Sequence, residues 1–240
     1  MDNNKRIYKS DKEAIAEIIE VGRRMYAKGF VAANDGNISC KVSDNSIWTT
    51  CTGVSKGFLT EDMLVKMNLD GTIIKGNSVP SSEVKMHIRV YKENSNVLAV
   101  THAHPPLATS FAIAGIGLNK AILPEAIVQL GTVPVAKYAT PGTEGIPDSI
   151  APFCKDYTSV LLANHGALTW GKNVTEAFYH MESVEYYALV TLITEKILNK
   201  QNELSGEQIR ELAKIRESMG MSSNILPKGI SSAVNMQNVY

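Results

Sequence analysis

The stretch VLAVTHAHPP at residues 97–106 predicts a buried strand that ends in two histidines and runs into a helix. Residues 97–100 are apolar, Thr101 is β-branched, and the run follows a turn-prone segment, which is typical of a buried strand. Side chains alternate between the two faces of a strand, so His102 and His104 point the same way. The two prolines that follow favour a helix start, because proline is tolerated in the first helical turn. The stretch therefore brings two imidazoles within reach of one ion.

A catalytic zinc site usually has three protein ligands and one open position, so a third ligand is expected elsewhere in the chain. His165 is the best candidate, because it lies in a turn after a second apolar strand, from which an imidazole can point into a cleft. His87 and His180 fall inside predicted helices, where a core or capping role is favoured. We therefore expect His102, His104 and His165 to bind a divalent metal.

Hydrophobic periodicity and turn residues predict the elements around this strand. Ser10 and Glu13 have the spacing of a capping box, and an amphipathic helix follows them to about Lys28. The other elements expected are hairpins of strands 37–42 with 47–50 and 64–69 with 72–75, a helix capped by Ser81 or Ser82, strands 159–163 and 167–170, helices 174–198 and 207–218, and a loosely packed tail. Hairpins early and helices later predict an α+β or a three-layer α/β/α domain with a largely antiparallel sheet.

Length and charge limit the kinds of partner that the chain can have. A single domain over residues 1–240 is the simplest interpretation of a chain with 44% hydrophobic residues. The 24 basic and 24 acidic side chains cancel, which argues against nucleic acid or an anionic membrane surface as a partner. An anionic ligand would have to be held by a local site.

Cysteine usage and the N-terminal sequence favour the cytoplasm. Cys40, Cys51 and Cys154 form no CxxC pair and leave one cysteine over, so a disulfide framework is not expected. No apolar stretch follows the basic residues of the N-terminus, and no run of 18 apolar residues occurs. We expect neither export nor a membrane span.

A carboxylate stands at the start of the helix that Ser81 or Ser82 would cap. Glu83 in the first turn could serve the helix dipole alone, which is the common role of an acidic residue there. The two serines also offer hydroxyl and backbone N–H groups at a helix N-terminus, which is a suitable site for a phosphate. In that case Glu83 would stand beside the anion.

Two glycine-containing turns, at residues 33–37 and 52–55, could each present backbone N–H groups to an anion. Turns of this composition are usually only turns, so neither is specific alone. Their interest lies in their combination with three histidines, because a metal site for an anionic substrate uses both kinds of group.

The chain resembles the class II aldolase and adducin family, and most closely its L-fuculose-1-phosphate aldolase branch. The resemblance covers about residues 10–200 and leaves a C-terminal helix and tail at residues 201–240. It rests on six motifs that occur in the family's order: Gly36-Asn37-Ile38-Ser39, Thr52-Gly53, Ser81-Ser82-Glu83, His102-Ala103-His104-Pro105, Tyr138-Ala139-Thr140-Pro141-Gly142-Thr143 and Asn164-His165-Gly166.

The resemblance implies a three-layer α/β/α sandwich assembled as a cyclic homotetramer, with each active site at a subunit boundary. It also implies a zinc ion as Lewis acid, Glu83 as the catalytic acid and base, and cleavage of a ketose 1-phosphate into dihydroxyacetone phosphate and a small aldehyde. The zinc ligands that it implies are His102, His104 and His165. The residues that it places around the substrate phosphate are Asn37, Thr52, Gly53, Ser81 and Ser82.

Two departures from the family pattern concern the aldehyde half of the substrate. The aldolase branch uses a tyrosine of the adjacent subunit to protonate the aldehyde oxygen, whereas this chain has Leu123-Pro124-Glu125. Glu125 or water could take that step. A second family tyrosine lies on a C-terminal tail, and here the tail's sole tyrosine is the terminal Tyr240.

Other members of the family keep the metal site but differ in reaction. A pentulose-phosphate 4-epimerase tends to have Asp in place of Glu83, and a methylthioribulose-phosphate dehydratase tends to lack the Ser81-Ser82 pair. A decarboxylase of related sugar acids is a further alternative. A non-catalytic adducin-like binding module would not need the three histidines.

Overall fold

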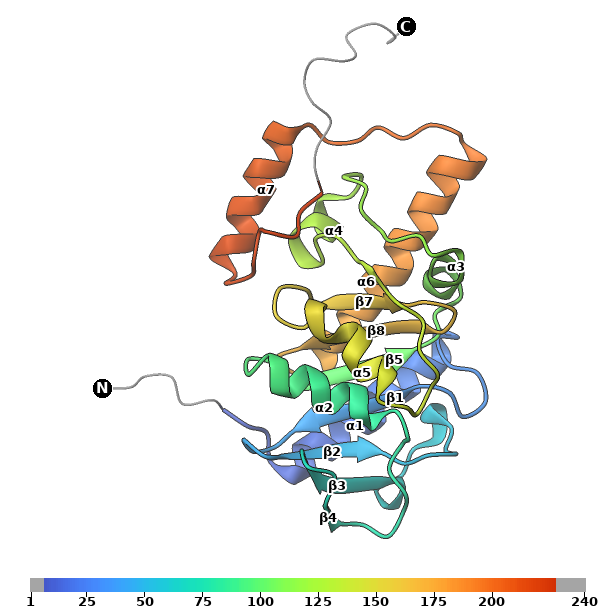
Figure 1. Cartoon of the computed structure of the whole chain (residues 1–240), viewed down its shortest axis with the longest axis vertical. Helices are drawn as coiled ribbons and strands as arrows, with labels where there is room; N and C mark the ends of the chain where they lie inside the picture. The colour runs from blue at the N-terminus through green and yellow to red at the C-terminus, as the bar shows by residue number, and fades with distance from the viewer. Residues whose placement is uncertain (1–6, 228–240) are drawn as a thin grey trace, which may run out of the picture.

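The computed structural model describes residues 7–227, whose strands form one eight-stranded sheet in the order β4-β3-β2-β1-β5-β8-β7-β6 (Figure 1). The strands are β1 Asn37–Lys41, β2 Ser46–Thr50, β3 Leu64–Asn68, β4 Ile73–Lys75, β5 Ala99–Ala103, β6 Val135–Ala136, β7 Ser159–Leu162 and β8 Gly166–Gly171. Every neighbouring pair is antiparallel except β6 with β7. The largely antiparallel sheet expected from the sequence is confirmed.

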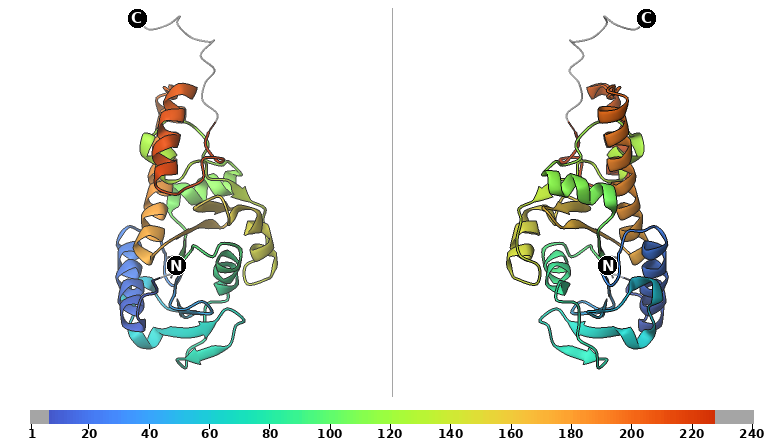
Figure 2. Two further views of the ribbon diagram at one scale, coloured as in Figure 1. Left: turned by 90° about the vertical axis from the view of Figure 1, so that its left-hand side faces the viewer. Right: turned by 90° about the vertical axis from the view of Figure 1, so that its right-hand side faces the viewer.

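Helices cover both faces of the sheet, which makes the three-layer sandwich (Figure 2). The helices are α1 Asp11–Ala27, α2 Val84–Glu93, α3 Pro106–Ala114, α4 Pro124–Gln129, α5 Gly145–Ile150, α6 Val174–Leu192 and α7 Gly206–Ser218. The side chains of α1, α3 and α6 pack on one face of the sheet, and those of α2 and α5 pack on the other. None of the helices within residues 7–227 is long and apolar enough to cross a membrane.

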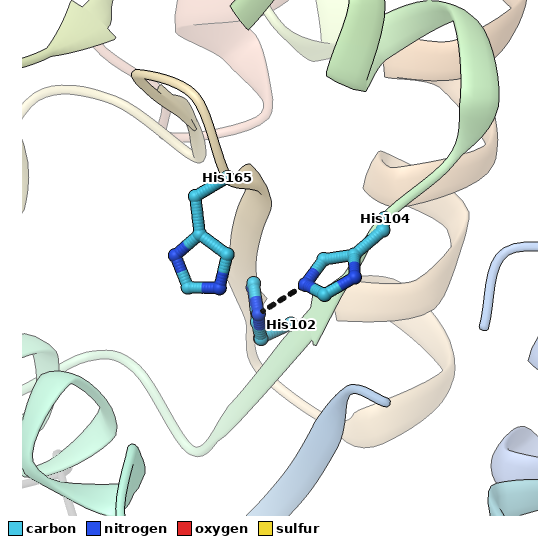
Figure 3. Close-up of side chains that lie close together, drawn as sticks. All are labelled: His102, His104 and His165. Atoms are coloured by element: carbon cyan, nitrogen blue, oxygen red, sulfur yellow. Dashed lines mark hydrogen bonds between the residues drawn. The ribbon is translucent and has the colours of Figure 1, made fainter. Parts of the chain in front are cut away.

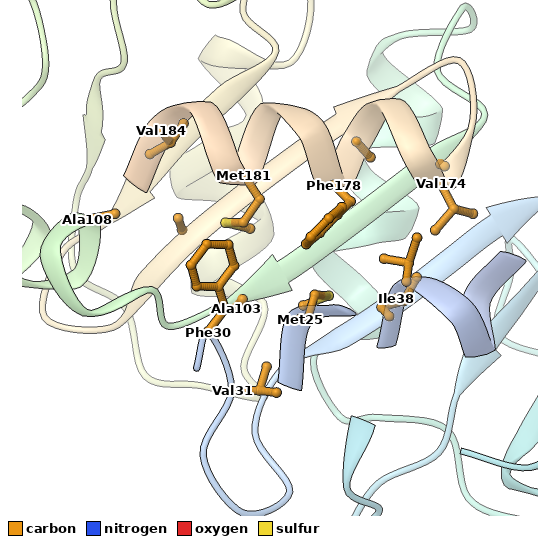
Figure 4. Close-up of a cluster of buried hydrophobic side chains, with 14 of the residues drawn as sticks. Met25, Phe30, Val31, Ile38, Ala103, Ala108, Val174, Phe178, Met181 and Val184 are labelled. Carbon is orange, nitrogen blue, oxygen red and sulfur yellow. The ribbon is translucent and has the colours of Figure 1, made fainter. Parts of the chain in front are cut away.

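The larger hydrophobic core fixes the central strand β5 against α6 (Figure 4). Phe178 and Met181 of α6 are fully buried and belong to the same cluster as Ala103 of β5 and Met25 of α1. Removing a buried aromatic side chain of this kind costs about 3–5 kcal/mol, so the position of β5 is strongly determined. This strand carries His102.

The sequence located most elements and misplaced several of their ends. The capping box of α1 is confirmed, since the Ser10 hydroxyl accepts the Glu13 N–H and the Glu13 carboxylate accepts the Ser10 N–H. Strand β5 begins at Ala99 and ends at Ala103, so His102 lies within the strand and not beyond its end. The long helix α6 is regular only to Leu192 and continues as a π-helical segment, Ile193–Ile197.

The start of α2 and the C-terminal tail differ from expectation. Glu83, and not Ser81 or Ser82, is the N-cap residue of α2, and the Ser81 hydroxyl accepts the Glu83 N–H at 3.3 Å. The segment after α7 is packed, because Ile225 is buried and its carbonyl accepts the Thr132 N–H at 2.9 Å. The rest of the tail, from residue 228 on, lies outside the described residues.

His87 of α2 has the core role that its helical position predicts. It is completely buried, and its Nδ1 lies 2.7 Å from the Ser39 hydroxyl, which also contacts the Tyr91 hydroxyl. Burial lowers the pKa of His87 from 6.5 to about 3, although the charge of Glu83 opposes this shift. The imidazole is therefore neutral in the folded protein at neutral pH.

The low pKa of His87 predicts a loss of stability in acid. Below pH 6.5 the unfolded chain binds a proton at this residue that the folded chain excludes until about pH 3, so folding becomes less favourable as the pH falls through that window. His87→Gln should flatten the slope of unfolding free energy against pH by about 1.4 kcal/mol per pH unit. Urea unfolding of both proteins at several pH values measures this slope. Parallel profiles would contradict the assignment.

Candidate functional site

The three histidines expected to bind metal meet at one end of the central strands (Figure 3). His102 lies in β5, His104 follows this strand, and His165 lies in the turn between β7 and β8. Strand β5 pairs antiparallel with β8, with Ala103 opposite Ala167, which brings the end of one strand beside the start of the other. One ligand atom from each histidine lies within 4.8 Å of the others.

The hydrogen bonds of His102 and His104 leave two nitrogen lone pairs facing each other. The Nδ1 of His102 lies 2.9 Å from the Ala167 carbonyl, and the Nδ1 of His104 lies 3.3 Å from the Asp35 carboxylate. Both acceptors require a proton on Nδ1, which leaves each Nε2 unprotonated in the neutral ring. The two Nε2 atoms are only 3.1 Å apart. Two lone pairs at this distance favour a cation between them.

Burial keeps these imidazoles in the form that binds metal. Desolvation lowers the pKa of His102 to about 3, against the opposing charge of Glu83. Desolvation also lowers the pKa of His104, helped by the charge of His165 and opposed by Asp35. Neutral imidazole is the ligand form, so neither residue needs to lose a proton at neutral pH before it binds an ion. In a zinc site with Zn–N bonds of about 2.0–2.1 Å, ligand nitrogens lie about 3.3–3.4 Å apart, and this cluster fits such a site after small adjustments.

Glu83 completes the cluster from the start of α2. Its carboxylate lies 3.1 Å from Nε2 of His165 and 3.5 Å from Nε2 of His102, and it accepts a hydrogen bond of 2.9 Å from the Asn37 amide. Burial raises the pKa of Glu83, but the charge that His102 gains when it is protonated in acid and the hydrogen bonds from His165 and Asn37 outweigh it and lower the pKa to about 2. The side chain is therefore an ionised carboxylate beside the three histidines.

The residues expected around a phosphate lie on adjacent segments next to Glu83. Cys51 forms an isolated antiparallel bridge with Pro80, which sets Thr52 opposite Val79 and Thr50 opposite Ser81. The backbone N–H of Thr52 donates to the Val79 carbonyl at 3.0 Å. The N–H of Ser81 is also engaged, donating to Thr50 at 3.2 Å.

The expectation that both segments present free backbone N–H groups is therefore wrong for Thr52 and Ser81. Four groups on these two segments have no hydrogen-bond partner among the described residues. They are the Thr52 hydroxyl, the Gly53 N–H, and the N–H and hydroxyl of Ser82. Gly53 has φ +73°, a conformation that glycine adopts without strain. The motif at residues 138–143 reaches the same place, since a Cβ at Gly142 would lie 3.7 Å from that of Ser82.

Glu125 and Tyr240, the candidates for the aldehyde half, are not brought to the cluster within one chain. Glu125 is exposed in the first turn of α4, and no contact among the described residues joins it to the three histidines. It lines a hollow with Glu182 and Tyr186 on the surface of the molecule. Tyr240 lies outside the described residues.

Sequence reasoning missed the second role of the turn at residues 33–37, which is to orient His104, one of the expected metal ligands. The Asp35 carboxylate binds Nδ1 of His104, an arrangement that fixes ring orientation in many metal sites. Gly36 lets the turn pack against the ligand strand, because a Cβ there would lie 2.7 Å from the His102 carbonyl oxygen. No local pattern distinguishes this aspartate from an ordinary turn residue.

Lys56 is a second functional candidate that the sequence did not reveal. Its side chain is buried, and its ammonium donates to the Asn34 carbonyl at 2.7 Å and the Val54 carbonyl at 2.6 Å. Lys56 therefore ties the turn that carries Asp35 to the turn that carries Gly53. Burial lowers its pKa to about 8, against the charges of Asp35 and Glu83.

The chain is similar in sequence to a known protein family and to several of its members. The sequence pattern of the Class II Aldolase and Adducin N-terminal domain matches residues 16–192. The L-fuculose phosphate aldolase of Methanococcus maripaludis is 33% identical over 179 residues, which cover 75% of this chain and 96% of the relative. The 3-oxo-tetronate 4-phosphate decarboxylase of Pectobacterium atrosepticum is 31% identical over 209 residues, which cover 85% of this chain and 94% of the relative.

The fold comparison agrees with the sequence comparison. A solved structure of an L-fuculose 1-phosphate aldolase matches with a TM-score of 0.79 and 29% sequence identity, and the match covers 86% of this chain and 97% of that one. The relatives therefore share a fold with this chain but are named for two different reactions.

Replacing Lys56 tests whether it holds the two turns in place. Lys56→Met leaves two carbonyls without their donor, so the Asp35 turn loosens and His104 loses its fixed orientation. We expect divalent-metal affinity to fall by about tenfold, in the range for residues that orient metal ligands. Competition with a chromophoric chelator measures this affinity, and Lys12→Met, at an exposed lysine of α1, is the matched control. Equal affinities in the two variants would exclude the role.

Proposed function

The chain belongs to the class II aldolase and adducin family, and on this premise we propose that it is a zinc-dependent aldolase. It reversibly cleaves a ketose 1-phosphate similar to L-fuculose 1-phosphate into dihydroxyacetone phosphate and a small aldehyde. The observation that carries the proposal is the ionised Glu83 carboxylate, 3.1 Å from one ring of the three-histidine cluster and 3.5 Å from another. A carboxylate and a metal at this spacing can act on neighbouring atoms of one small substrate.

Zinc suits the cluster because three neutral imidazoles leave an open position for substrate, as in catalytic zinc sites. Imidazole also binds manganese and cobalt, so one of these ions could replace zinc in the cell. When bound, the metal supplies Lewis-acid chemistry at the ketose carbonyl. Imidazole binds a metal in its neutral form, so such ligands would leave the full charge of the ion to act on the substrate.

Glu83 would move the proton at the carbon next to the carbonyl. In the substrate-free site, contacts with His165 and Asn37 keep it ionised, in the form of a base. A substrate that enters between Glu83 and the histidines removes some of these contacts while burial persists, which raises the pKa of the carboxyl. Glu83 can then hold the proton and return it to carbon, which is the behaviour required of a reversible acid and base.

The free groups of Thr52, Gly53 and Ser82 would bind the substrate phosphate, with Asn37 and Ser81 holding the walls of that site. The buried ammonium of Lys56 lies beneath the same turns and adds positive charge there. Fixing the phosphate sets the register of the substrate, so that its reacting carbons meet Glu83 and the metal.

A second subunit would complete the part of the active site that binds the aldehyde half of the substrate. Within one chain Glu125 is exposed and makes no contact with the cluster, so we propose that it reaches the active site of a neighbouring copy in a homotetramer.

A decarboxylase is the second candidate, because one relative with 31% identity over 85% of this chain is named for that reaction. Loss of carbon dioxide from a 3-oxo-tetronate 4-phosphate leaves the same three-carbon enediolate that aldol cleavage of a ketose 1-phosphate leaves. Both reactions therefore end in dihydroxyacetone phosphate, and both would use Glu83 to protonate the same carbon. They differ in the group that departs.

Substrate choice separates the two candidates. We expect a coupled assay for dihydroxyacetone phosphate to respond to at least one of fuculose, rhamnulose, ribulose and 5-deoxyribulose 1-phosphates, more strongly than to 3-oxo-tetronate 4-phosphate. Release of carbon dioxide is measured in parallel. A response to the oxo acid alone would replace the aldolase by the decarboxylase, and a response to none of them would remove both.

Glu83→Gln tests the proton transfer separately from metal binding. The amide keeps the shape of the side chain but cannot act as a base, so turnover should fall by roughly a hundredfold or more. Zinc content, measured by plasma mass spectrometry, should remain about one ion per subunit. Glu61→Gln, at an exposed carboxylate, is the control for both readings. Unchanged turnover in Glu83→Gln would remove this residue from the mechanism.

A further inference from the structure

A buried polar cluster joins helix α2 to strand β1 one helical turn beyond Glu83. The Ser39 hydroxyl of β1 lies 2.7 Å from Nδ1 of His87 and 2.7 Å from the Tyr91 hydroxyl, and both partners belong to α2. All three residues are buried. We call Ser39, His87 and Tyr91 the α2–β1 clamp. Burying polar groups costs free energy unless they are hydrogen-bonded, so the packing of α2 on β1 has to preserve these contacts.

The Ser39 hydroxyl is the group on which the clamp depends. Nε2 of His87 is buried and has no hydrogen-bond partner within residues 7–227, so Ser39 is the sole partner of this ring there. Because a hydroxyl carries one proton, Ser39 can donate to only one of its two partners, and the other must donate to it. Loss of the hydroxyl would leave the His87 ring unpaired in the core, which costs more than the hydrogen bond itself contributes.

The same strand and the same helix carry Glu83 and the amide that binds it. Asn37 precedes Ser39 by two residues in β1, and Glu83, the N-cap residue of α2, precedes His87 by four. Side chains two residues apart in a strand and four apart in a helix share a face. The Asn37–Glu83 hydrogen bond of 2.9 Å and the α2–β1 clamp are therefore neighbouring connections between one strand and one helix.

The Asn37–Glu83 hydrogen bond has no side-chain support of its own. Oδ1 of Asn37 is buried and has no partner in the described part of the chain, so the amide is oriented only by Glu83 and by its place in β1. The Glu83 side chain makes no capping bond to α2, and its remaining contacts are with the rings of His102 and His165. The position of the carboxylate thus depends on the spacing of β1 and α2.

We propose that Ser39, His87 and Tyr91 are positioning residues that hold Glu83 at the three-histidine cluster. No hydrogen bond or ion pair among residues 7–227 joins any of the three to that cluster, so they act through the spacing of β1 and α2. The kinetic consequence rests on the proposed function, whereas the position of Glu83 can be measured without turnover. A misplacement of about 1 Å can lower turnover about a hundredfold, so a small shift of α2 is detectable.

Crystal structures of the metal-loaded protein and its variants test the position of Glu83. In Ser39→Ala and in Tyr91→Phe, the Asn37 amide nitrogen should move from 2.9 Å to beyond about 3.5 Å from the Glu83 carboxylate, outside hydrogen-bond range. The second variant remains informative if Ser39→Ala fails to fold.

Tyr187→Phe is the matched control for the crystal structures. It also removes a buried, hydrogen-bonded hydroxyl, but from α6 on the other face of the sheet, so it should leave the Asn37–Glu83 bond intact. A bond kept in both clamp variants, or lost equally in Tyr187→Phe, would overturn the proposal.

Turnover distinguishes positioning from a general loss of structure. With the substrate that the wild-type protein turns over fastest, Ser39→Ala should lower kcat about tenfold and Tyr91→Phe about threefold, with KM changed less than about twofold. Added to Glu83→Gln, the same substitutions should lower kcat less than about twofold, because the group that they position is no longer a base.

Each kinetic outcome decides one of the two proposals. A merely structural role would lower kcat equally in the wild-type and Glu83→Gln backgrounds, and that result would overturn the positioning role. A wild-type protein that turns over none of the substrates named above would refute the proposed function, and the crystal structures would then decide the role of the clamp alone.

Discussion

The pairing of β5 with β1 on one side and with β8 on the other is the constraint on which the site depends. It places Asn37 directly opposite His102, and it brings the turn that carries His165 to the end of β5. The register is fixed because both faces of the central sheet are buried under helices, and a slip of one residue would turn every side chain to the wrong face. The three histidines therefore owe their geometry to the packing of the whole domain.

This geometry also determines which groups at the site are charged and which partner each of them has. Neutral imidazoles surround the place where two lone pairs face each other, and the nearby acidic groups, Glu83 and Asp35, have different partners. Asp35 orients a ring, whereas Glu83 stands beside the cluster with its own amide donor from Asn37. In the proposed mechanism, Asp35 orients a ligand and Glu83 reacts, which separates metal binding from proton transfer. Lys56, which binds only main-chain carbonyls, gives the surrounding turns their shape.

The sequence was most informative where residues able to bind a metal occur at the spacing of a regular secondary structure. His102 and His104 follow from the alternation of a strand, and the turn around His165 made it the best third ligand. Asp35 and Lys56 were not predictable in their roles, because each acts on a residue brought to it by pairing between distant strands and turns. The same limit explains the error at Thr52 and Ser81, whose N–H groups looked free in sequence but serve the bridge between two segments. Hairpins and capping residues are local, and the sequence located them well.

The long separation between His104 and His165 has a consequence for the order of events during synthesis. A ribosome that has released only the first 150 residues has exposed two of the three imidazoles, and strand β8, which fixes them, does not yet exist. Contacts between residues so far apart form late, after the entropy of closing a long loop has been overcome. The nascent chain therefore cannot use the metal as a template for its early folding. An ion held by the three histidines would enter a sheet that hydrophobic packing has already built.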